Sequence, residues 1–189
     1  VMLELFRGCI RGCRFCQAGY VYRPVRSRSP ELLARYGKAA CEDSGYQEMT
    51  LSSLSSTDYP CLLELCDDLL DYCAPRDIGL SLPSMRADTF SMNLMERLQR
   101  VRKGGLTFAP EAGTQRLRDA INKNLREEEL LQSVRTAFTG GWNGVKLYFM
   151  LGLPTETDED VLGIADLARK VYFAWRECSP NKARGVRIT

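Results

Sequence analysis

Short apolar runs alternate along this chain with longer segments in which apolar residues recur every three or four positions. Each run covers about five residues and is bounded by polar residues, glycine or proline, a pattern typical of buried strands in a parallel sheet. The expected strands cover residues 2–6, 47–52, 78–82, 105–109, 144–150 and 185–189.

The segments between these runs have helical periodicity, and two of them carry clear boundary signals. Ser29 is typical of an N-cap and Pro30 of a first helical position, so a helix is expected to begin there. Another helix should stop before Pro75, because the residue preceding a proline disfavours helical backbone. The expected helices cover residues 30–43, 60–73, 91–102, 114–122, 127–139 and 158–177.

This order of elements predicts an α/β fold with a parallel sheet joined by right-handed crossovers. Six strands without a sixth helix predict a partial (β/α)6 TIM-like barrel that is truncated at strand six. The chain opens directly on a strand, without an initiator Met, and no linker or repeat divides it. We therefore expect a single domain over residues 1–189 that is a fragment of a longer protein.

Three cysteines follow the first strand within eight residues. Cys9, Cys13 and Cys16 form a Cys-x3-Cys-x2-Cys array, and two glycines in the same segment let the backbone turn sharply. Thiolates are the ligands that select iron–sulfur clusters, zinc or Cu(I). Three of them would leave one iron of a cubane open to a substrate or cofactor. The alternative is a tetrahedral zinc site completed by a fourth thiolate such as Cys41.

The composition narrows the possible functions. The chain has no histidine, which removes imidazole from every metal-ligand, general-base and triad hypothesis, and its net charge is only +2. No apolar stretch approaches the roughly 20 residues of a membrane span. Without a secretory leader the other cysteines should be reduced, so we expect a cytoplasmic protein. These cysteines are Cys41, Cys61, Cys66, Cys73 and Cys178.

The cysteine array, with the aromatic Phe15 just before its last cysteine, resembles the signature of the radical S-adenosylmethionine (SAM) superfamily. The resemblance implies a barrel of the radical SAM type and a [4Fe-4S] cluster held by Cys9, Cys13 and Cys16. It further implies that SAM chelates the fourth iron and is cleaved reductively to methionine and a 5′-deoxyadenosyl radical. The electron would come from a flavodoxin-like or ferredoxin-like donor.

The resemblance also assigns a role to the serine-rich segment after the second strand. In the family, a Gly-Gly-Glu-type motif at this position cradles the amine of SAM with backbone carbonyls. Ser53, Leu54 and Ser55 occupy that position here without the glycines. The alternative is a serine-rich turn that caps the next helix.

Two charged residues after the fourth strand are candidates for contacts with SAM. Glu111 ends that strand, and a carboxylate there can accept hydrogen bonds from ribose hydroxyls or from an ammonium. Lys123 ends an Ile-Asn-Lys triplet that resembles the Ile-Asn-Arg of several radical SAM branches, where the cation pairs with the SAM carboxylate. The alternative is an acid at a helix start and a solvated base.

The segment after the fifth strand resembles the Gly-[Phe/Leu]-Pro-Gly-Glu-Thr element of methylthiotransferase-like and cobalamin-linked radical SAM proteins. Gly152 permits close backbone approach to a flat ligand, so Leu151, Gly152 and Phe15 are expected to bracket the adenine of SAM. The acids that follow are interpreted as helix-capping residues. Arg86, after the third strand, is either a ligand for an anionic substrate or a surface arginine.

Residues 7–28 contain six arginines and no acid. Such a patch could attract RNA, and Tyr20 and Tyr22 could stack on bases, but charge compensation around an electron-rich cluster explains it more simply.

The chain therefore resembles uncharacterised bacterial radical SAM proteins that carry a cobalamin-binding-like region, so cobalamin is implied through a domain outside residues 1–189. The competing class is a non-catalytic iron–sulfur or zinc module for electron transfer or RNA binding. The sequence does not define the substrate.

Overall fold

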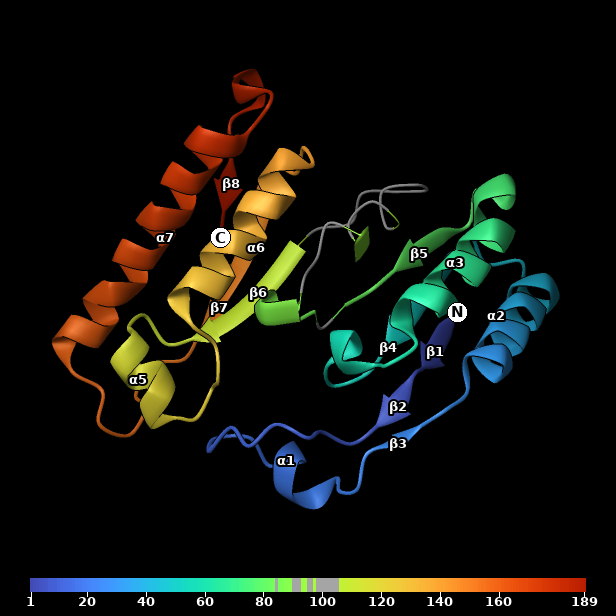
Figure 1. Ribbon diagram of the computed structural model, residues 1–189, viewed down its shortest axis with the longest axis horizontal. Coiled ribbons are helices and arrows are strands. Elements are labelled where there is room, and N and C mark those ends of the chain that lie inside the picture. The colour runs from blue at the N-terminus through green and yellow to red at the C-terminus, as the bar shows by residue number, and fades with distance from the viewer. Residues whose placement is uncertain (84, 90–92, 95–96, 98–105) are drawn as a thin grey trace. The chain divides into compact units, whose positions relative to one another are not determined.

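The computed structural model describes residues 1–83, 85–89, 93–94, 97 and 106–189. The chain forms two compact units, each built from two stretches of sequence (Figure 1). Unit 1 comprises Val1–Ile10 and Tyr22–Gly104, and unit 2 comprises Arg11–Val21 and Gly105–Thr189. Most of the expected helix 91–102 lies outside the described residues.

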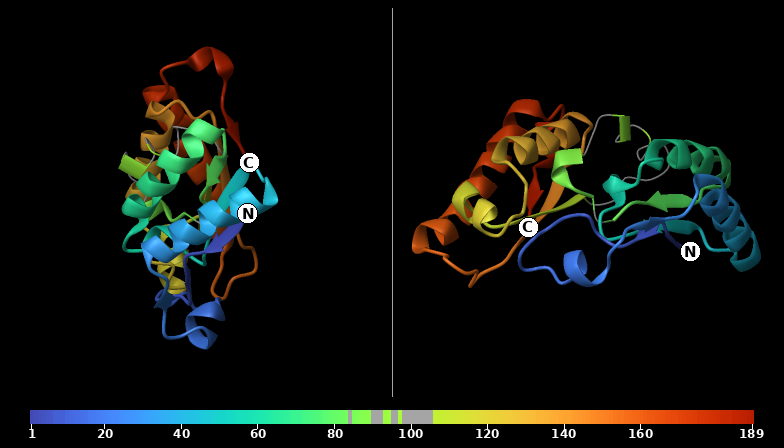
Figure 2. Two further views of the ribbon diagram at one scale, coloured as in Figure 1. Left: turned by 90° about the vertical axis from the view of Figure 1, so that its right-hand side faces the viewer. Right: turned by 60° about the horizontal axis from the view of Figure 1, so that its bottom comes forward.

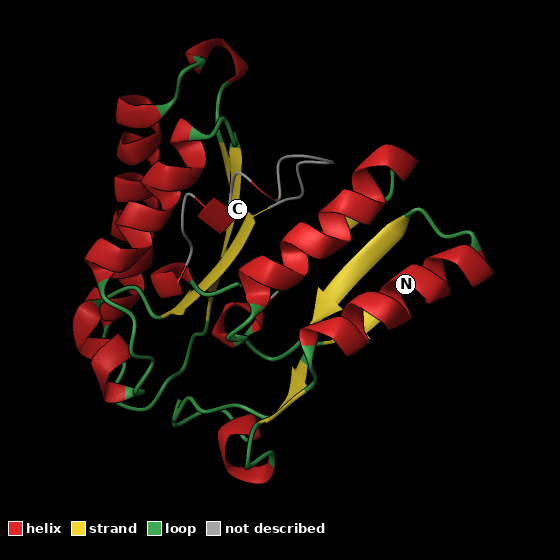
Figure 3. Cartoon of the chain, turned by 45° about the vertical axis from the view of Figure 1, so that its right-hand side comes forward, coloured by secondary structure: helices red, strands yellow, loops and turns green. Residues whose placement is uncertain are grey.

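Unit 1 is built on a parallel sheet with the strand order β1-β4-β5. Leu3 lies opposite Leu51, and Met49 lies opposite Leu80, so apolar side chains form rows across the sheet. The helices α2 and α3 pack against each other along this sheet (Figure 3). The elements of the sheet and its helices are β1 (Met2–Glu4), α2 (Pro30–Ser44), β4 (Glu48–Ser52), α3 (Leu62–Cys73) and β5 (Gly79–Ser81). Short 3-10 turns are η1 (Ser56–Asp58), η2 (Ala74–Arg76) and η3 (Ala87–Thr89).

The core of unit 1 is a continuous apolar cluster between the sheet and its two helices. Leu51 comes from β4, Leu33 from α2 and Leu69 from α3, and each is almost completely buried. Burial of such a side chain contributes roughly 1.5–3 kcal/mol to folding. The apolar stripes anticipated from the sequence therefore hold this unit together.

The expected strand 2–6 is interrupted, because the chain changes partners at Leu5. The Leu5 N–H donates to Ser52 O at 2.9 Å and continues the parallel sheet, whereas Leu5 O accepts from Arg28 N at 3.1 Å. Beyond this point β2 (Phe6–Arg7) pairs antiparallel with β3 (Arg26–Ser27). The prediction of one strand was wrong here. The antiparallel pair β2–β3, which was not predicted, flanks the segment that carries Cys9, Cys13 and Cys16, called the cysteine segment below.

Unit 2 is built on a second parallel sheet, with the order β6-β7-β8. Its long helices α6 and α7 pack side by side (Figure 2). Residues alternate along β7, where Val145 and Leu147 are buried while Lys146 and Tyr148 are exposed. The elements of unit 2 are α1 (Ala18–Val21), β6 (Leu106–Glu111), α5 (Gln115–Ala120), α6 (Glu127–Thr139), β7 (Gly144–Phe149), α7 (Asp158–Cys178), η4 (Lys182–Arg184) and β8 (Arg187–Ile188).

Local boundary signals were correct at two helices, and the predicted range was correct at a third. Ser29 Oγ accepts from Leu32 N at 3.3 Å at the start of α2, and α3 ends at Cys73, before the proline. The predicted range 127–139 coincides with α6. The α/β class is therefore observed, whereas the partial barrel truncated at strand six and the single domain stay predictions. Within the described residues, no helix is both long and apolar enough to cross a membrane.

Candidate functional site

The cysteine segment leaves unit 1 through a close contact between its two ends. Gly8 has a φ of +108°, and a Cβ added there would lie 2.7 Å from Tyr22 O. The next residue continues the contact, since Cys9 N donates to Tyr22 O at 3.3 Å. Both the backbone conformation and the lack of space therefore require glycine at this position.

The middle of the segment docks on the end of α5, entirely within unit 2. Arg14 N donates to Ile121 O at 2.9 Å, and Arg14 Nη1 donates to Ala120 O at 2.7 Å. Asn122 Nδ2 in turn donates to Gly12 O at 2.7 Å. The two bonds from Arg14 satisfy carbonyls at the C-terminal end of the helix. These bonds and the one from Asn122 also fix the backbone on both sides of Cys13.

The thiols themselves fit an iron–sulfur cluster by their chemistry. All eight cysteines lie in the described part of the chain, and none forms a disulfide. Cys13 is buried, and Cys16 N donates to Cys13 O at 3.1 Å in the turn that joins them. In the part of the chain that the structure describes, no three side chains among His, Cys, Asp and Glu form a metal-binding group. Convergence of Cys9, Cys13 and Cys16 on one cluster therefore stays a prediction.

The proposed fourth zinc ligand has a different environment. Cys41 lies on α2 within the apolar core of unit 1 and is almost completely buried. Burial raises the pKa of its thiol, which disfavours the thiolate that zinc requires. This environment argues against the zinc alternative.

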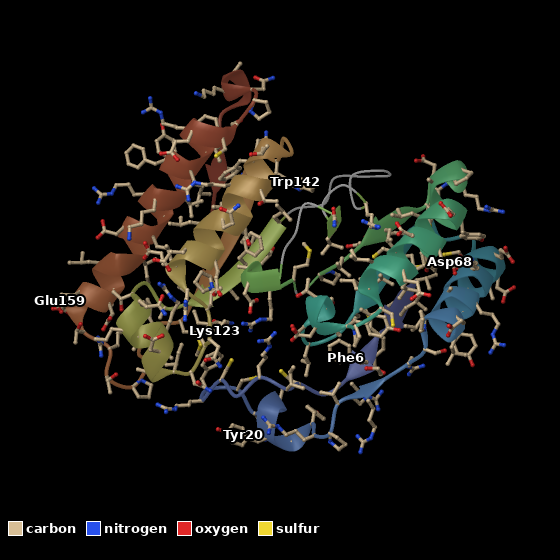
Figure 4. The ribbon with its side chains drawn as sticks, viewed as in Figure 1. Phe6, Tyr20, Asp68, Lys123, Trp142 and Glu159 are labelled. Carbon is tan, nitrogen blue, oxygen red and sulfur yellow. The ribbon has the colours of Figure 1, made fainter. Side chains whose placement is uncertain are left out.

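Glu111 and Lys123, both candidates for contacts with SAM, form an ion pair. Lys123 Nζ donates to Glu111 Oε1 at 3.0 Å, and both side chains are more than four-fifths buried. The Lys123 ammonium, labelled in Figure 4, also lies 6.0 Å from the centre of the Phe15 ring. Three residues predicted to contact SAM, from the cysteine segment, β6 and the end of α5, thus form one cluster.

The backbone of Glu111 is strained in a way that is common at functional positions. A register shift separates Phe108 from Glu111 in the pairing of β6 with β7. Glu111 itself has a φ of +68°, which is uncommon for a residue with a side chain. Its carbonyl oxygen accepts from Met150 N at 2.8 Å, so the strained residue is tied to the loop after β7.

The loop from Met150 to Thr157 carries the residues expected near adenine. Leu151 is largely exposed, and Gly152 has a φ of +79° with open space where a Cβ would stand. Gly152 N donates to Glu156 Oε2 at 2.6 Å, a contact that the sequence analysis did not anticipate. Glycine is therefore needed at 152 for its backbone conformation and not for lack of room.

A buried arginine in unit 2 was also missed. Arg118 is 1% exposed, and its Nη1 donates to Ala112 O at 2.9 Å while its Nη2 donates to Gln115 Oε1 at 3.1 Å. Burial lowers the pKa of this guanidinium, and the nearby Glu127 opposes that effect. Helical periodicity gives no signal for such a residue, because its partners are the turn after β6, its own helix and, at 3.8 Å, Glu127 of α6.

The serine-rich segment of unit 1 is held by neutral hydrogen bonds. Ser53 Oγ donates to Ser56 Oγ at 3.1 Å, and Ser56 Oγ donates to Pro83 O at 2.9 Å. Leu54 is about half exposed, whereas Ser55 is buried and its Oγ has no hydrogen-bond partner within the described residues. The N-cap of the next α-helix, α3, is Cys61, so these serines do not cap it, and their role with SAM stays a prediction.

Several arginines considered as ligands are engaged within the protein. Arg86 forms two hydrogen bonds of 2.9 Å to the carboxylate of Asp88. Arg7 and Arg28 both donate to Glu4, at 2.9 and 3.2 Å. The arginine-rich segment is therefore partly neutralised, and it offers less positive charge to RNA than its sequence indicated.

Comparison with known proteins identifies the family to which these features belong. The family model of the radical SAM superfamily matches residues 3–168. An uncharacterized protein of Methanocaldococcus jannaschii is 39% identical over 170 residues, which cover 90% of this chain and 37% of that protein. A tRNA-2-methylthio-N(6)-dimethylallyladenosine synthase of Pelotomaculum thermopropionicum is 28% identical over 90% of this chain and 40% of its own length. The chain thus spans about two-fifths of these relatives.

The fold agrees with this result. The radical SAM methyltransferase TsrM from Kitasatospora setae, whose structure holds cobalamin and a [4Fe-4S] cluster, superposes with a TM-score of 0.74 over 90% of this chain and 34% of its own. Its sequence identity is 14%, so this similarity concerns the fold alone. Since the family model covers most of the chain and includes the cysteine array, the chain belongs to the radical SAM superfamily.

Proposed function

We propose that Cys9, Cys13 and Cys16 hold a [4Fe-4S] cluster and that the adjoining residues bind SAM for reductive cleavage. The observation that supports this most directly is the docking of residues 12–14 on the end of α5, immediately before Lys123. When bound and reduced, the cluster supplies the electron that breaks a carbon–sulfur bond of SAM and releases methionine and a 5′-deoxyadenosyl radical.

The protein's own groups bind and orient the SAM. Lys123 is assigned to the methionyl carboxylate, since it is a partly buried cation beside the cysteine segment. Glu111 holds that cation at 3.0 Å and is assigned to the ribose hydroxyls. Because the pair is already in place, little side-chain entropy is lost when SAM binds.

The flat part of SAM is assigned to Phe15, Leu151 and Gly152. Leu151 is exposed and Gly152 has open space above its backbone, so a planar ring can approach the main chain closely. Backbone groups of Ser53 to Ser55 are assigned to the methionyl amine, a role that does not depend on their hydroxyls.

The whole protein is proposed to contain more than this core. The radical SAM fold of the neighbours is the support for a partial (β/α)6 barrel in this chain. TsrM is described with cobalamin, and we extend that cofactor to the full-length protein, bound outside residues 1–189. A flavodoxin-like or ferredoxin-like donor in the cytoplasm is proposed to supply the electron.

The test is anaerobic reconstitution with iron and sulfide, followed by dithionite, SAM and an assay for 5′-deoxyadenosine. Replacing Cys9, Cys13 or Cys16 by Ala should abolish the brown chromophore and the product, because an iron with two open positions is labile. Cys178→Ala is the matched control, since that cysteine is also partly exposed but lies at the end of α7. Equal bleaching by the control, or a brown protein that produces no 5′-deoxyadenosine, would refute the proposal.

A further inference from the structure

A single buried carboxylate joins the starts of two helices in unit 2. Asp160 lies in the first turn of α7 and is 2% exposed. It accepts from Thr157 N at 2.9 Å and from Thr157 Oγ1 at 3.0 Å, which is the ordinary capping of its own helix. Figure 4 labels its neighbour Glu159 at this end of α7.

The same carboxylate accepts two further hydrogen bonds from the turn that follows β6. Thr114 Oγ1 donates to one oxygen of Asp160, and Arg116 Nη2 donates to the other. Thr114 is itself the N-cap of α5, since its Oγ1 accepts from Leu117 N at 3.3 Å. Asp160 therefore bridges the N-caps of α5 and α7, which capping alone does not require.

Arg116 extends this bridge into the loop after β7. Besides Asp160, its Nη2 donates to Thr155 O at 2.8 Å. Thr155 has a φ of +70°, a conformation that costs free energy unless surrounding contacts hold it. The arginine thus ties the strained part of the loop to the start of α5.

Close backbone packing brings the same two segments together. A Cβ added to Gly113 would lie 2.3 Å from Ile164 N and 2.5 Å from Asp160 O. A Cβ added to Gly163 would lie 2.7 Å from Thr114 Cγ2. The turn after β6 therefore rests directly on α7, and the carboxylate of Asp160 lies at this contact.

From this geometry we infer that Asp160 and Arg116 are positioning residues that fix the loop after β7 relative to Glu111. The inference rests on the proposed SAM site, because that loop carries Leu151 and Gly152 while Glu111 precedes the turn. Neither residue is proposed to touch SAM. This clamp, formed by Asp160 and Arg116, sets the distance between Glu111, assigned to the ribose, and the backbone at Gly152, assigned to the adenine.

The electrostatics agree with a permanently charged clamp. The hydrogen bond from Thr114, followed by the one from Arg116, holds the pKa of Asp160 well below its usual range despite the opposing effect of burial. The carboxylate is therefore ionised wherever the enzyme is folded at moderate pH, and it keeps all four donors in place.

The experiment compares Asp160→Asn and Arg116→Gln with Asp166→Asn. Asp166 lies on the same helix in an exposed pair with Arg169 at 3.0 Å, so its variant makes the same chemical change without a clamp. Arg116 is half exposed, so its variant should fold even where Asp160→Asn does not. Both clamp variants should raise the apparent KM for SAM in uncoupled cleavage about tenfold and leave kcat within about a factor of two.

A second measurement needs no cofactor. Amide hydrogen exchange in residues 151–156 should become about tenfold faster in the two clamp variants and should not change in Asp166→Asn. The inference would be overturned if a folded clamp variant kept the parent's exchange rate in residues 151–156 or the parent's KM for SAM. It would also be overturned if kcat fell while KM stayed constant. If the parent itself cleaves no SAM, the proposed function fails instead, and the exchange data still decide whether the clamp orders the loop.

Discussion

The two units bury their polar groups in opposite ways. In unit 1, Cys41, Cys66 and Cys73 lie in an apolar core, and burial raises the pKa of Cys66 to about 12 and that of Cys73 to about 11. Unit 2 instead buries the ions Arg118 and Asp160 among several hydrogen-bond partners. Among the described residues, the charged side chains that are almost fully buried therefore lie in unit 2, whereas the buried polar groups of unit 1 are neutral.

This difference determines how precisely each unit fixes its loops. A neutral thiol packs like a small apolar group and needs no partner, so it places no demand on distant segments. A buried ion is tolerated only when donors or acceptors from other elements surround it. The charges of unit 2 thus hold the turn that follows Glu111 against the loop that carries Gly152, and single substitutions there should have larger effects.

The largest contrast is expected between Arg118→Ala and Cys66→Ala. Loss of the guanidinium leaves Ala112 O without its donor and removes the cation beside Glu127, whereas Gln115 Oε1 still accepts from Glu127 N. This loss should destabilise unit 2 by about 3–5 kcal/mol. Cys66→Ala should cost unit 1 about 1 kcal/mol. Urea unfolding followed by tryptophan fluorescence reports on unit 2, because Trp142 and Trp175 both lie there. Circular dichroism follows both units.

Arg118→Met is the control for this experiment, because it replaces the charge by an apolar chain of similar length. A Met variant as unstable as the Ala variant would assign the effect to the lost hydrogen bonds. An Ala variant within about 1 kcal/mol of the parent would contradict the contrast between the units.

A smaller effect is expected at alkaline pH. The pKa of Cys66 is raised from an ordinary 9.0 to about 12, so its contribution to stability is complete below pH 9 and is lost as the pH rises toward 12. At pH 10 this loss amounts to about 1.4 kcal/mol. The drop in urea midpoint between pH 8 and pH 10 should therefore be smaller in Cys66→Ala than in the parent. Equal drops in the urea midpoint would show that ionisation of this thiol does not limit the stability of unit 1 at alkaline pH.

The pH dependence of stability has the opposite sign for Asp160, the buried carboxylate of unit 2. Because the pKa of Asp160 is lowered, its contribution is complete above the ordinary aspartate range and is lost as the pH falls below about 4.

The smallest expected effect is a difference in SAM affinity between variants of Lys123 and Ser53. Lys123→Met removes the charge assigned to the SAM carboxylate and should weaken SAM binding about fivefold in calorimetry of the reconstituted protein. Ser53→Ala removes a neutral hydroxyl that donates to Ser56 Oγ and accepts from Ser55 N, so the affinity should stay within about a factor of two. A stronger effect at Ser53 would show that the serine side chains, and not the backbone, contact SAM.

Features that depend on neighbouring residues were predictable from the sequence. Ser29 and Pro30 mark the start of α2 because capping is settled within one turn of helix. The range of α6 and the start of α7 at Asp158 follow for the same reason. Glu111 and Lys123 were each singled out from the sequence, but their ion pair was not predicted.

Features that depend on distant residues were not predictable. The switch of partners at Leu5 requires Arg28, and nothing in an apolar run indicates where a strand changes sheets. Asp160 was interpreted as a capping residue, which is correct, but its bonds to Thr114 and Arg116 cross more than 40 positions of sequence. Arg118 differs, because its hydrogen-bond partners are near in sequence, and what the sequence does not indicate is its burial.

The contact between Gly113 and Gly163 has a consequence for how this sequence can diverge. Neither position has room for a methyl group, and the nearest atoms at Gly113 belong to the backbone, which cannot rotate away. A mutation at either position is tolerated only if α7 shifts, and such a shift would change the other position too. Across homologous chains we therefore expect these two glycines, 50 residues apart, to be inherited together or lost together.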